Sequence, residues 1–276
     1  MTRVGAVVIL GLIMAGCQPA EVSDEIDLGP GAGGPVPEGL TTGTVVRVND
    51  GDSVVVETGS GAVEVRMMGI NTPERDECFG AEAEDRLIEL IDGEEVGLED
   101  VGQDQFDRAL AYLRLGDRLV NLDQVEGGFA IATTPEEGDR HGPAIIEAEE
   151  FAFETGLGMW SDTVCGASGL VPSVEVSSES SFDPRGPDEE VLGEEWVTIS
   201  GNETLDLEGW VIRDESSQHR CHLGPGVSLD PGTELRVTSA DPCWDPGGTS
   251  VWNNGGDMAL LQDPSGRVIA RYRYVG

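Results

Sequence analysis

Turn-forming residues divide this chain of 276 residues into short segments, and this division limits its possible folds more than any other feature. The chain contains 39 glycines and 15 prolines, whereas aromatic residues make up only 5%. Such a composition favours many turns and short elements over long helices. Because 38% of the residues are hydrophobic and 25% are charged, the chain can still form packed cores. Its length allows one large domain or two small ones.

The first residues of the chain are typical of an export signal. A single basic residue, Arg3, precedes an apolar run that is too short to cross a bilayer. The run ends in small residues followed by Cys17, which resembles the cleavage site of bacterial lipoproteins; an ordinary signal peptide with an incidental cysteine is the alternative. We expect residues 1–16 to be a lipoprotein signal peptide and Cys17 to carry a lipid anchor, which places the protein on the cell envelope, outside the cytoplasm. Residues 17–40 are rich in Pro, Gly and acids and are typical of a flexible tether.

The cysteines after the signal indicate disulfide bonds. The chain has five cysteines, of which Cys17 is the first. The even number that remains favours disulfides in an exported protein, and three pairings are possible. Spacing favours Cys78–Cys165 and Cys221–Cys243, one pair for each half of the chain. Neither pair has the CxxC spacing of a zinc or redox site, and we expect the histidines beside Cys221 to lie at the surface.

Two domains are expected after the tether. Within residues 41–161, strand patterns come first and helix patterns follow. The predicted strands cover 44–47, 53–57, 62–68 and 108–114, and the predicted helices cover 81–91, 120–130 and 143–155. Ala83, Leu87, Leu90 and Ile91 form one apolar stripe along the first helix. This order favours a short twisted barrel with packed helices.

The second domain is predicted to contain strands alone. It covers residues 172–276 and follows a linker over residues 162–171. Its predicted strands cover 196–199, 207–213, 234–238, 258–262 and 268–274, with Asn, Gly and Pro turns between them. Short strands punctuated in this way predict an all-β sandwich. Asp206, Asp214 and Glu215 could hold a cation, but solvated carboxylates are the expected state.

Acidic, amide and arginine side chains in the first domain favour phosphodiester chemistry when they are taken together. A DGD turn at 50–52 and an NTPE turn at 71–74 offer oxygens to a hard cation. Arg66 lies inside an apolar strand and Arg108 begins another, and arginines in such places are costly unless they meet anions. Each segment alone is more often structural than catalytic. Together they fit a site in which a cation and guanidinium groups neutralise charge on phosphorus oxygens while a carboxylate activates water.

The same segments resemble the staphylococcal nuclease (thermonuclease) family. The resemblance runs through VNDGDSVVV, VRMMGINTPE, DRALAYL, VNLDQVEGGFA and MWS, in family order and at family spacing, over about residues 42–161. It implies an OB-fold β-barrel of five strands with packed helices, an α+β domain. It also implies calcium-dependent cleavage of DNA and RNA.

The resemblance carries a set of cation ligands to this chain. Asp52 would bind Ca²⁺ directly, and Asn71 and the carbonyl of Thr72 would complete the protein ligands. Asp50 precedes the first ligand and would shape the turn. Asn71 replaces a family aspartate, which removes one negative charge from the site and should weaken cation binding.

The resemblance also carries catalytic roles. Glu74 would be the general base or would orient the attacking water. Arg66 and Arg108 would bind the phosphate and stabilise the pentacoordinate transition state. Residues 105–107 (QFD) replace a Lys-Tyr-Gly segment that contacts the terminal phosphate, and residues 133–136 (TTPE) lack a pair of tyrosines that would flank the nucleotide. Those phosphate contacts, and that support for base stacking, are therefore missing.

Charge sets the main physical obstacle to binding nucleic acid. The net charge is −37, and all 16 basic residues are arginines. Residues 41–161 alone contain 8 arginines and 28 acids, a net charge of −20. A broad basic face for nucleic acid is therefore excluded, since DNA carries about one negative charge per 1.7 Å of its axis. We expect weak substrate binding and an activity that improves with moderate salt or excess Ca²⁺.

The second domain resembles the lamin-tail domain, an immunoglobulin-like β-sandwich, over about residues 172–276. The matching features are an EWV strand at 195–197, an LEGW segment at 207–210, a Pro-Gly pair at 231–232 and a WNNGGD segment at 252–257. The tryptophans are best interpreted as core or edge packing. The resemblance supplies no catalytic residue and leaves the partner of this domain unknown.

The resulting hypothesis is a multidomain, envelope-anchored and calcium-dependent nuclease, in which an OB-fold barrel is followed by an all-β sandwich and the substrate is DNA, RNA or both. One alternative is a non-catalytic surface lipoprotein that binds through the barrel and the sandwich. Another is a structural envelope lipoprotein whose sandwich is the working part. Arg66, Glu74 and Arg108 discriminate between these hypotheses, because a purely binding module does not need all three.

Overall fold

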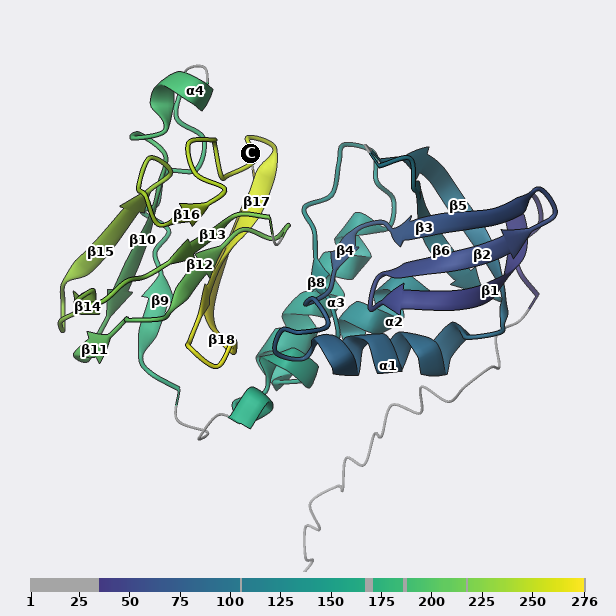
Figure 1. Ribbon diagram of the computed structural model, residues 1–276, viewed down its shortest axis with the longest axis horizontal. Coiled ribbons are helices and arrows are strands. Elements are labelled where there is room, and N and C mark those ends of the chain that lie inside the picture. The colour runs from purple at the N-terminus through teal and green to yellow at the C-terminus, as the bar shows by residue number, and fades with distance from the viewer. Residues whose placement is uncertain (1–34, 105, 167–170, 186–187, 217, 276) are drawn as a thin grey trace, which may run out of the picture.

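A computed structural model describes residues 35–104, 106–166, 171–185, 188–216 and 218–275 of the chain. The predicted signal peptide and Cys17 lie outside these ranges, as does most of the predicted tether. Figure 1 shows two domains beside each other, a barrel with helices in purple to teal and a domain made mostly of strands in green to yellow. No helix in the described ranges is long and apolar enough to cross a membrane.

The first domain is a closed barrel of five strands, which confirms the predicted barrel fold. Its strands are β1 (Thr41–Asp50), β2 (Ser53–Thr58), β3 (Gly61–Met67), β5 (Glu95–Gln103) and β6 (Ala109–Leu115). β1 pairs antiparallel with β2 and β5, β2 pairs with β3, and β5 pairs with β6. A parallel pairing of β3 with β6 closes the ring. The short strand β7 (Arg118–Leu119) extends β6, and β4 (Ile70–Asn71) pairs with β8 (Ile131–Ala132) beside the barrel.

Three helices cover the barrel: α1 (Gly80–Ile91), α2 (Val120–Glu126) and α3 (Gly142–Thr155). The predicted stripe of α1 is confirmed, since Ala83, Leu87, Leu90 and Ile91 are all buried. The predicted helix over 120–130 ends four residues early. Gly128, with φ +71°, takes up the left-handed backbone region that favours glycine.

Two further elements of the structure differ from those predicted from the sequence. β5 was not predicted from its own residues, because glycines and acids are depleted in strands. Val96 and Leu98 nevertheless point into the barrel core at alternate positions. Of the predicted strand over 207–213, only β12 (Val211–Arg213) forms: β11 (Leu205–Asp206) ends before that range, and Gly209 turns the chain between the two strands with φ +79°.

The second domain is a β-sandwich, as predicted. One sheet contains β9 (Val174–Val176), β10 (Trp196–Gly201) and β15 (Glu234–Thr238); the other contains β16 (Trp244–Asp245), β13 (Arg220–His222), β12, β17 (Gly256–Gln262) and β18 (Val268–Val275). β14 (Ser228–Leu229) pairs with β11, and α4 (Asp188–Val191) precedes β10. Trp210, Trp244 and Trp252 are buried in the core between the sheets.

Both predicted disulfides are present. Cys78–Cys165 connects the segment before α1 to η2 (Val164–Gly166), and Cys221–Cys243 lies within the sandwich. The first of these pairs also lies at the domain boundary, because a Cβ atom on Gly266 would come within 2.9 Å of the Cys78 Cβ atom.

The two domains share a buried apolar cluster. β17 and β18 lie on the side of the sandwich that faces α3 and β8 (Figure 1). Its members from the first domain are Ile131, Ala152 and, in η1 (Gly158–Trp160), Met159 and Trp160. Its members from the second domain are Met258 and Leu260, both in β17. Apolar burial across the boundary favours a fixed docking of the two domains over free relative motion.

Two of the predicted solvated acids are instead buried at this boundary. Asp214 and Glu215 are only 1% and 5% exposed, so the prediction is wrong for both. Asp214 accepts hydrogen bonds from the Ser216 hydroxyl and pairs with His219, while Asp206 is exposed as expected. His222 is exposed, and His219 is partly buried against Asp214.

Candidate active site

The turn between β1 and β2 presents the first candidate ligand. Asp50 shapes it, because its Oδ1 accepts the backbone N–H of Asp52 at 3.0 Å. Gly51 is required here, since a Cβ atom would come within 2.9 Å of the Ala83 Cβ atom and of the Thr72 side chain. The turn therefore packs tightly against α1 and leaves Asp52 only 5% exposed.

The Asp52 carboxylate is buried beside a second acid. Its Oδ2 accepts the backbone N–H of Thr72 at 2.8 Å and lies 2.8 Å from Nη1 of Arg66. Burial raises the pKa of Asp52 to about 6; the charge of Arg66 opposes this shift and that of Asp50 adds to it. One arginine thus compensates the two acids incompletely, which suits a site that takes up a hard cation.

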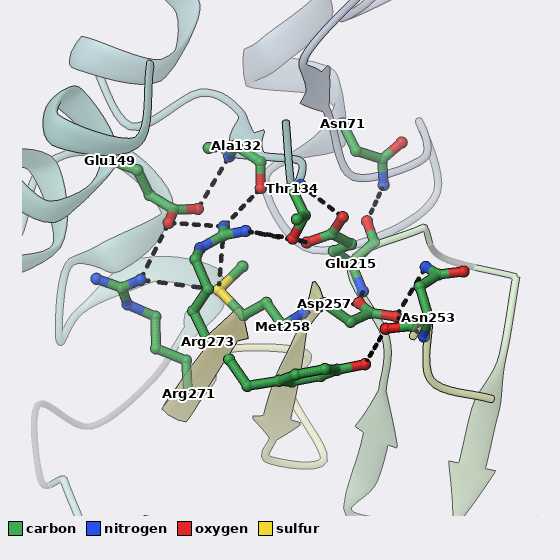
Figure 2. Close-up of polar contacts among 11 residues, drawn as sticks. Asn71, Ala132, Thr134, Glu149, Glu215, Asn253, Asp257, Met258, Arg271 and Arg273 are labelled. Atoms are coloured by element: carbon green, nitrogen blue, oxygen red, sulfur yellow. Dashed lines mark hydrogen bonds and ion pairs between the residues drawn. The ribbon is translucent and has the colours of Figure 1, made fainter. Parts of the chain in front are cut away.

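Arg66 and Asn71 are joined at the floor of the site. Arg66 Nη2 donates to Asn71 Oδ1 at 2.7 Å, and its Nη1 donates to the Met67 carbonyl at 3.2 Å. The Asn71 side-chain nitrogen donates to the backbone carbonyl of Glu215 at 3.1 Å (Figure 2). A guanidinium on one side and a carbonyl on the other fix which end of the amide is oxygen.

Glu74 lies at the exposed end of the loop that leads to α1. Its backbone N–H donates to Glu77 Oε2 at 3.0 Å, and its carbonyl accepts the Glu77 N–H at 2.8 Å. Partial burial raises the pKa of Glu74 above its usual range, and the charges of Asp50 and Glu77 raise it further. Arg66 and Arg220 act in the opposite direction. A raised pKa makes this carboxylate a stronger base.

Arg108 is held in place just before β6. Its Nε donates to Asp104 Oδ2 at 2.7 Å, and its backbone N–H donates to Asp104 Oδ1 at 2.9 Å. The guanidinium carbon lies 5.6 Å from the ring centre of Phe106, which is 67% exposed. Asp104 was missed in the sequence, where its only signal was an aspartate four residues before an arginine.

All of the predicted catalytic and cation-binding residues meet at one pocket of about 220 Å³. The parallel pairing of β3 with β6 sets Val65 beside Ala109, which brings Arg66 and Arg108 to the same rim. The pocket is lined by Asp50, Asp52, Ser53, Arg66, Asn71, Thr72, Glu74, Arg108, Ser216 and Gln218. Ser216 and Gln218 come from the second domain and had no local sequence signal.

The donor set fits calcium better than a metal that needs several ionised ligands. In the described ranges, no three or more His, Cys, Asp or Glu side chains gather at metal-binding spacing. The pocket instead combines the buried carboxylate of Asp52 with the side-chain oxygen of Asn71, and Thr72 also lines it. Calcium accepts amide and carbonyl oxygens beside carboxylates, so these residues fit it.

A larger cavity adjoins the pocket at Arg66. It measures about 600 Å³, and Tyr112 and residues 133–140 form much of its wall. The TTPE segment at 133–136 therefore lines the cavity next to the pocket. It offers no aromatic ring for base stacking.

Comparison with known proteins gives two family matches. The model of the staphylococcal nuclease homologue family matches residues 64–162, and the model of the lamin tail domain matches residues 176–276. An uncharacterized endonuclease of Haemophilus influenzae is 32% identical over 119 residues, which cover 43% of this chain and 65% of that protein. The thermonuclease of Staphylococcus hyicus is 30% identical over 126 residues, covering 43% of this chain and 75% of that protein. The micrococcal nuclease of Shigella flexneri is 31% identical over 129 residues, covering 44% and 74%.

Proposed function

We propose, from the premise that this chain belongs to the staphylococcal nuclease family and carries a lamin tail domain, that it hydrolyses the phosphodiester bonds of DNA, RNA or both. The observation that carries this proposal is the meeting of Arg66, Glu74 and Arg108 at the pocket that also contains Asp52 and Asn71. The names of the similar proteins, endonuclease and thermonuclease, agree with it.

The residues divide the reaction between them. Arg66 and Arg108 reach the pocket from adjacent strands and would bind the non-bridging oxygens of the phosphate, where negative charge increases in the transition state. Glu74 would accept a proton from the attacking water, which its raised pKa favours. Asp104 would keep the Arg108 side chain in the reactive orientation.

Calcium is the cation that we propose for this site. Asp52, Asn71 and the Thr72 carbonyl would hold it, and it would supply positive charge to the phosphate oxygens. Asn71 provides a neutral oxygen where a carboxylate would add charge, so we expect moderate rather than tight affinity.

Incubation of the purified protein with single-stranded DNA, in Ca²⁺ or in chelator, tests the proposal. Wild type should cleave only with Ca²⁺, and Arg108→Ala and Glu74→Gln should each lose roughly 10²-fold or more in rate. The exposed residues Arg47 on β1 and Glu57 on β2 supply matched controls, Arg47→Ala and Glu57→Gln, which should keep the wild-type rate. Equal rates for the wild type and both active-site variants would refute the enzymatic function and leave the binding alternative.

We also propose that the protein is exported and anchored to the envelope by a lipid on Cys17. The support is the apolar run that ends before Cys17 and the two disulfides, which are typical of oxidising compartments. Metabolic labelling with palmitate should mark the wild type and not Cys17→Ser. Membrane fractionation that places both forms in the soluble fraction would contradict the anchor.

A further inference from the structure

We propose that the lamin tail domain positions the catalytic loop, residues 71–77, so that the nuclease site is complete only when the two domains are docked. The loop runs from β4 to the segment before α1 and carries Asn71, Thr72 and Glu74. The inference rests on the proposed function and deepens it, because it assigns a part in the active site to a domain without catalytic residues. Contacts at both ends of the loop carry it.

The first contact fixes Asn71. Its side-chain nitrogen donates to the Glu215 carbonyl at 3.1 Å, across 144 residues of sequence. The bond is buried, with Asn71 8% exposed and Glu215 5% exposed. Because the nitrogen end faces the second domain, the oxygen end faces the pocket and Arg66.

Glu215 is itself held firmly, so its carbonyl is a fixed point. Its backbone N–H donates to Asp257 Oδ1 at 3.3 Å. Its carboxylate accepts the N–H and hydroxyl of Thr134 at 2.6 and 3.0 Å, and Arg273 Nη1 at 3.0 Å. Figure 2 shows this network continuing through Arg273 to Glu149 and the Ala132 carbonyl in the first domain.

The second contact fixes the other end of the loop through Glu77. The Glu77 carboxylate accepts the Glu74 backbone N–H at 3.0 Å and also forms an ion pair with Arg220. Arg213, whose side chain is 1% exposed, lies 3.9 Å from the same carboxylate. Two arginines of the second domain therefore hold the acid that supports the backbone of Glu74.

The same arrangement gives a physical reason for the asparagine at position 71. An amide can donate to the Glu215 carbonyl and still offer its oxygen to the pocket. A carboxylate in this position would set an ionised oxygen against a carbonyl oxygen, with no proton between them. The charge missing from the cation site is thus linked to a contact that only the second domain supplies.

Two arginines on β18 offer a matched pair of variants. Arg271 and Arg273 both pair with Glu149 and both contact the Met258 sulfur. Their side chains are 6% and 11% exposed. Only Arg273 is paired with Glu215, whereas Arg271 reaches Glu150 instead. Arg271→Met therefore removes interdomain ion pairs without loosening the carbonyl that holds Asn71.

The experiment compares Arg273→Met with Arg271→Met in the full protein. Hydrogen exchange of the amides at 71–79, the kcat and KM for single-stranded DNA, and the Ca²⁺ concentration for half-maximal rate are measured together. In Arg273→Met we expect about tenfold faster loop exchange and about tenfold lower kcat at unchanged KM, because small displacements of catalytic groups are costly. Arg271→Met should stay within about twofold of the wild type in each. Arg273→Lys should recover part of the kcat, since it keeps the charge beside Glu215.

Equal loop exchange in the two methionine variants would overturn the inference, and so would a loss of kcat in Arg273→Met without faster exchange. If Arg273→Met does not fold, Glu77→Gln replaces it, because this change weakens the second contact and alters no residue of the sandwich; unchanged exchange there would overturn the inference equally. A wild type that cleaves no nucleic acid would refute the proposed function alone, since the exchange comparison still reports on the loop.

Discussion

At the scale of single residues, the amide of Asn71 shows how a neutral side chain can serve a charged site. Its oxygen accepts a hydrogen bond from Arg66 and its nitrogen donates one to the Glu215 carbonyl, so both polar atoms of the side chain are hydrogen-bonded in the folded state. Asp52 then remains the single carboxylate among the three proposed ligands. Asn71 adds no negative charge to the site, but its two hydrogen bonds fix the position of its oxygen.

Asn71→Asp should therefore destabilise the protein when Ca²⁺ is absent. The substitution removes the donor to the Glu215 carbonyl and places a second carboxylate beside Arg66, near that of Asp52. We therefore expect the free energy of unfolding in chelator to fall by about 1–3 kcal/mol. Excess Ca²⁺ should recover part of this loss, because the added carboxylate is a better calcium ligand. Thermal unfolding with and without Ca²⁺ measures both effects; unchanged or higher stability in chelator would contradict the contact.

His219 is a second residue whose charge affects the stability of the fold. Its ring nitrogen lies 2.9 Å from Asp214, and this hydrogen bond raises the pKa of His219, helped by the charges of Asp257 and Glu195. A histidine whose folded pKa is raised adds stability that is fully present below its unfolded pKa of about 6.5. The contribution is lost as pH rises through the folded pKa.

His219→Gln should accordingly be less stable than the wild type at pH 5–6, and the difference should shrink towards pH 8–9. Thermal unfolding across this pH range measures it, and His222→Gln, at an exposed position, is the matched control. A difference that grows with pH would contradict the pairing of His219 with Asp214.

At the scale of elements, the sequence predicted those segments whose pattern is local. The stripe of α1, the β1–β2 turn and the Cys221–Cys243 pairing follow from spacing within short segments, and the structure contains them. β5 could not be predicted from propensity, because its acids and glycines oppose a strand and the closed barrel alone gives it partners on both edges. Tertiary pairing thus overrides local preference.

The residues of the candidate site also differ in whether a local sequence pattern could predict them. Its first-domain residues stand in turns and strand ends that a sequence pattern can mark. Ser216, Gln218 and the Glu215 carbonyl reach the pocket or its loop from the second domain, and the contact of Glu215 with Asn71 spans 144 residues of sequence, over which no local pattern connects them. The burial of Asp214 and Glu215 was missed for the same reason, since isolated acids in a turn are ordinarily solvated.

The Cys221–Cys243 disulfide allows a test at this scale. It closes a segment with a sequence separation of 22 and joins β13 to the segment before β16. The double change Cys221→Ala and Cys243→Ala should lower the free energy of unfolding of the sandwich by roughly 3 kcal/mol. Denaturant unfolding followed by tryptophan fluorescence measures the loss, with Cys78–Cys165 left intact in both proteins. A loss near zero would show that the disulfide does not constrain the unfolded chain.

At the scale of the whole molecule, charge decides how substrate approaches. A net charge of −37 repels a polyanion, and salt screens that repulsion over about 8–10 Å at 0.1–0.15 M. At saturating Ca²⁺, the cleavage rate should therefore rise from very low salt to moderate salt before it declines. Initial rates on one DNA substrate across a salt series measure this. A rate that falls steadily from the lowest salt upward would contradict the prediction.

The hydrogen bond between Asn71 and the Glu215 carbonyl also bears on how such proteins can be recombined. A chimaera whose lamin tail does not dock against this loop would lose this hydrogen bond, and a barrel with aspartate at position 71 would meet an opposing oxygen when placed here. Exchange of either module should therefore preserve activity only where the docking that forms this hydrogen bond is also preserved.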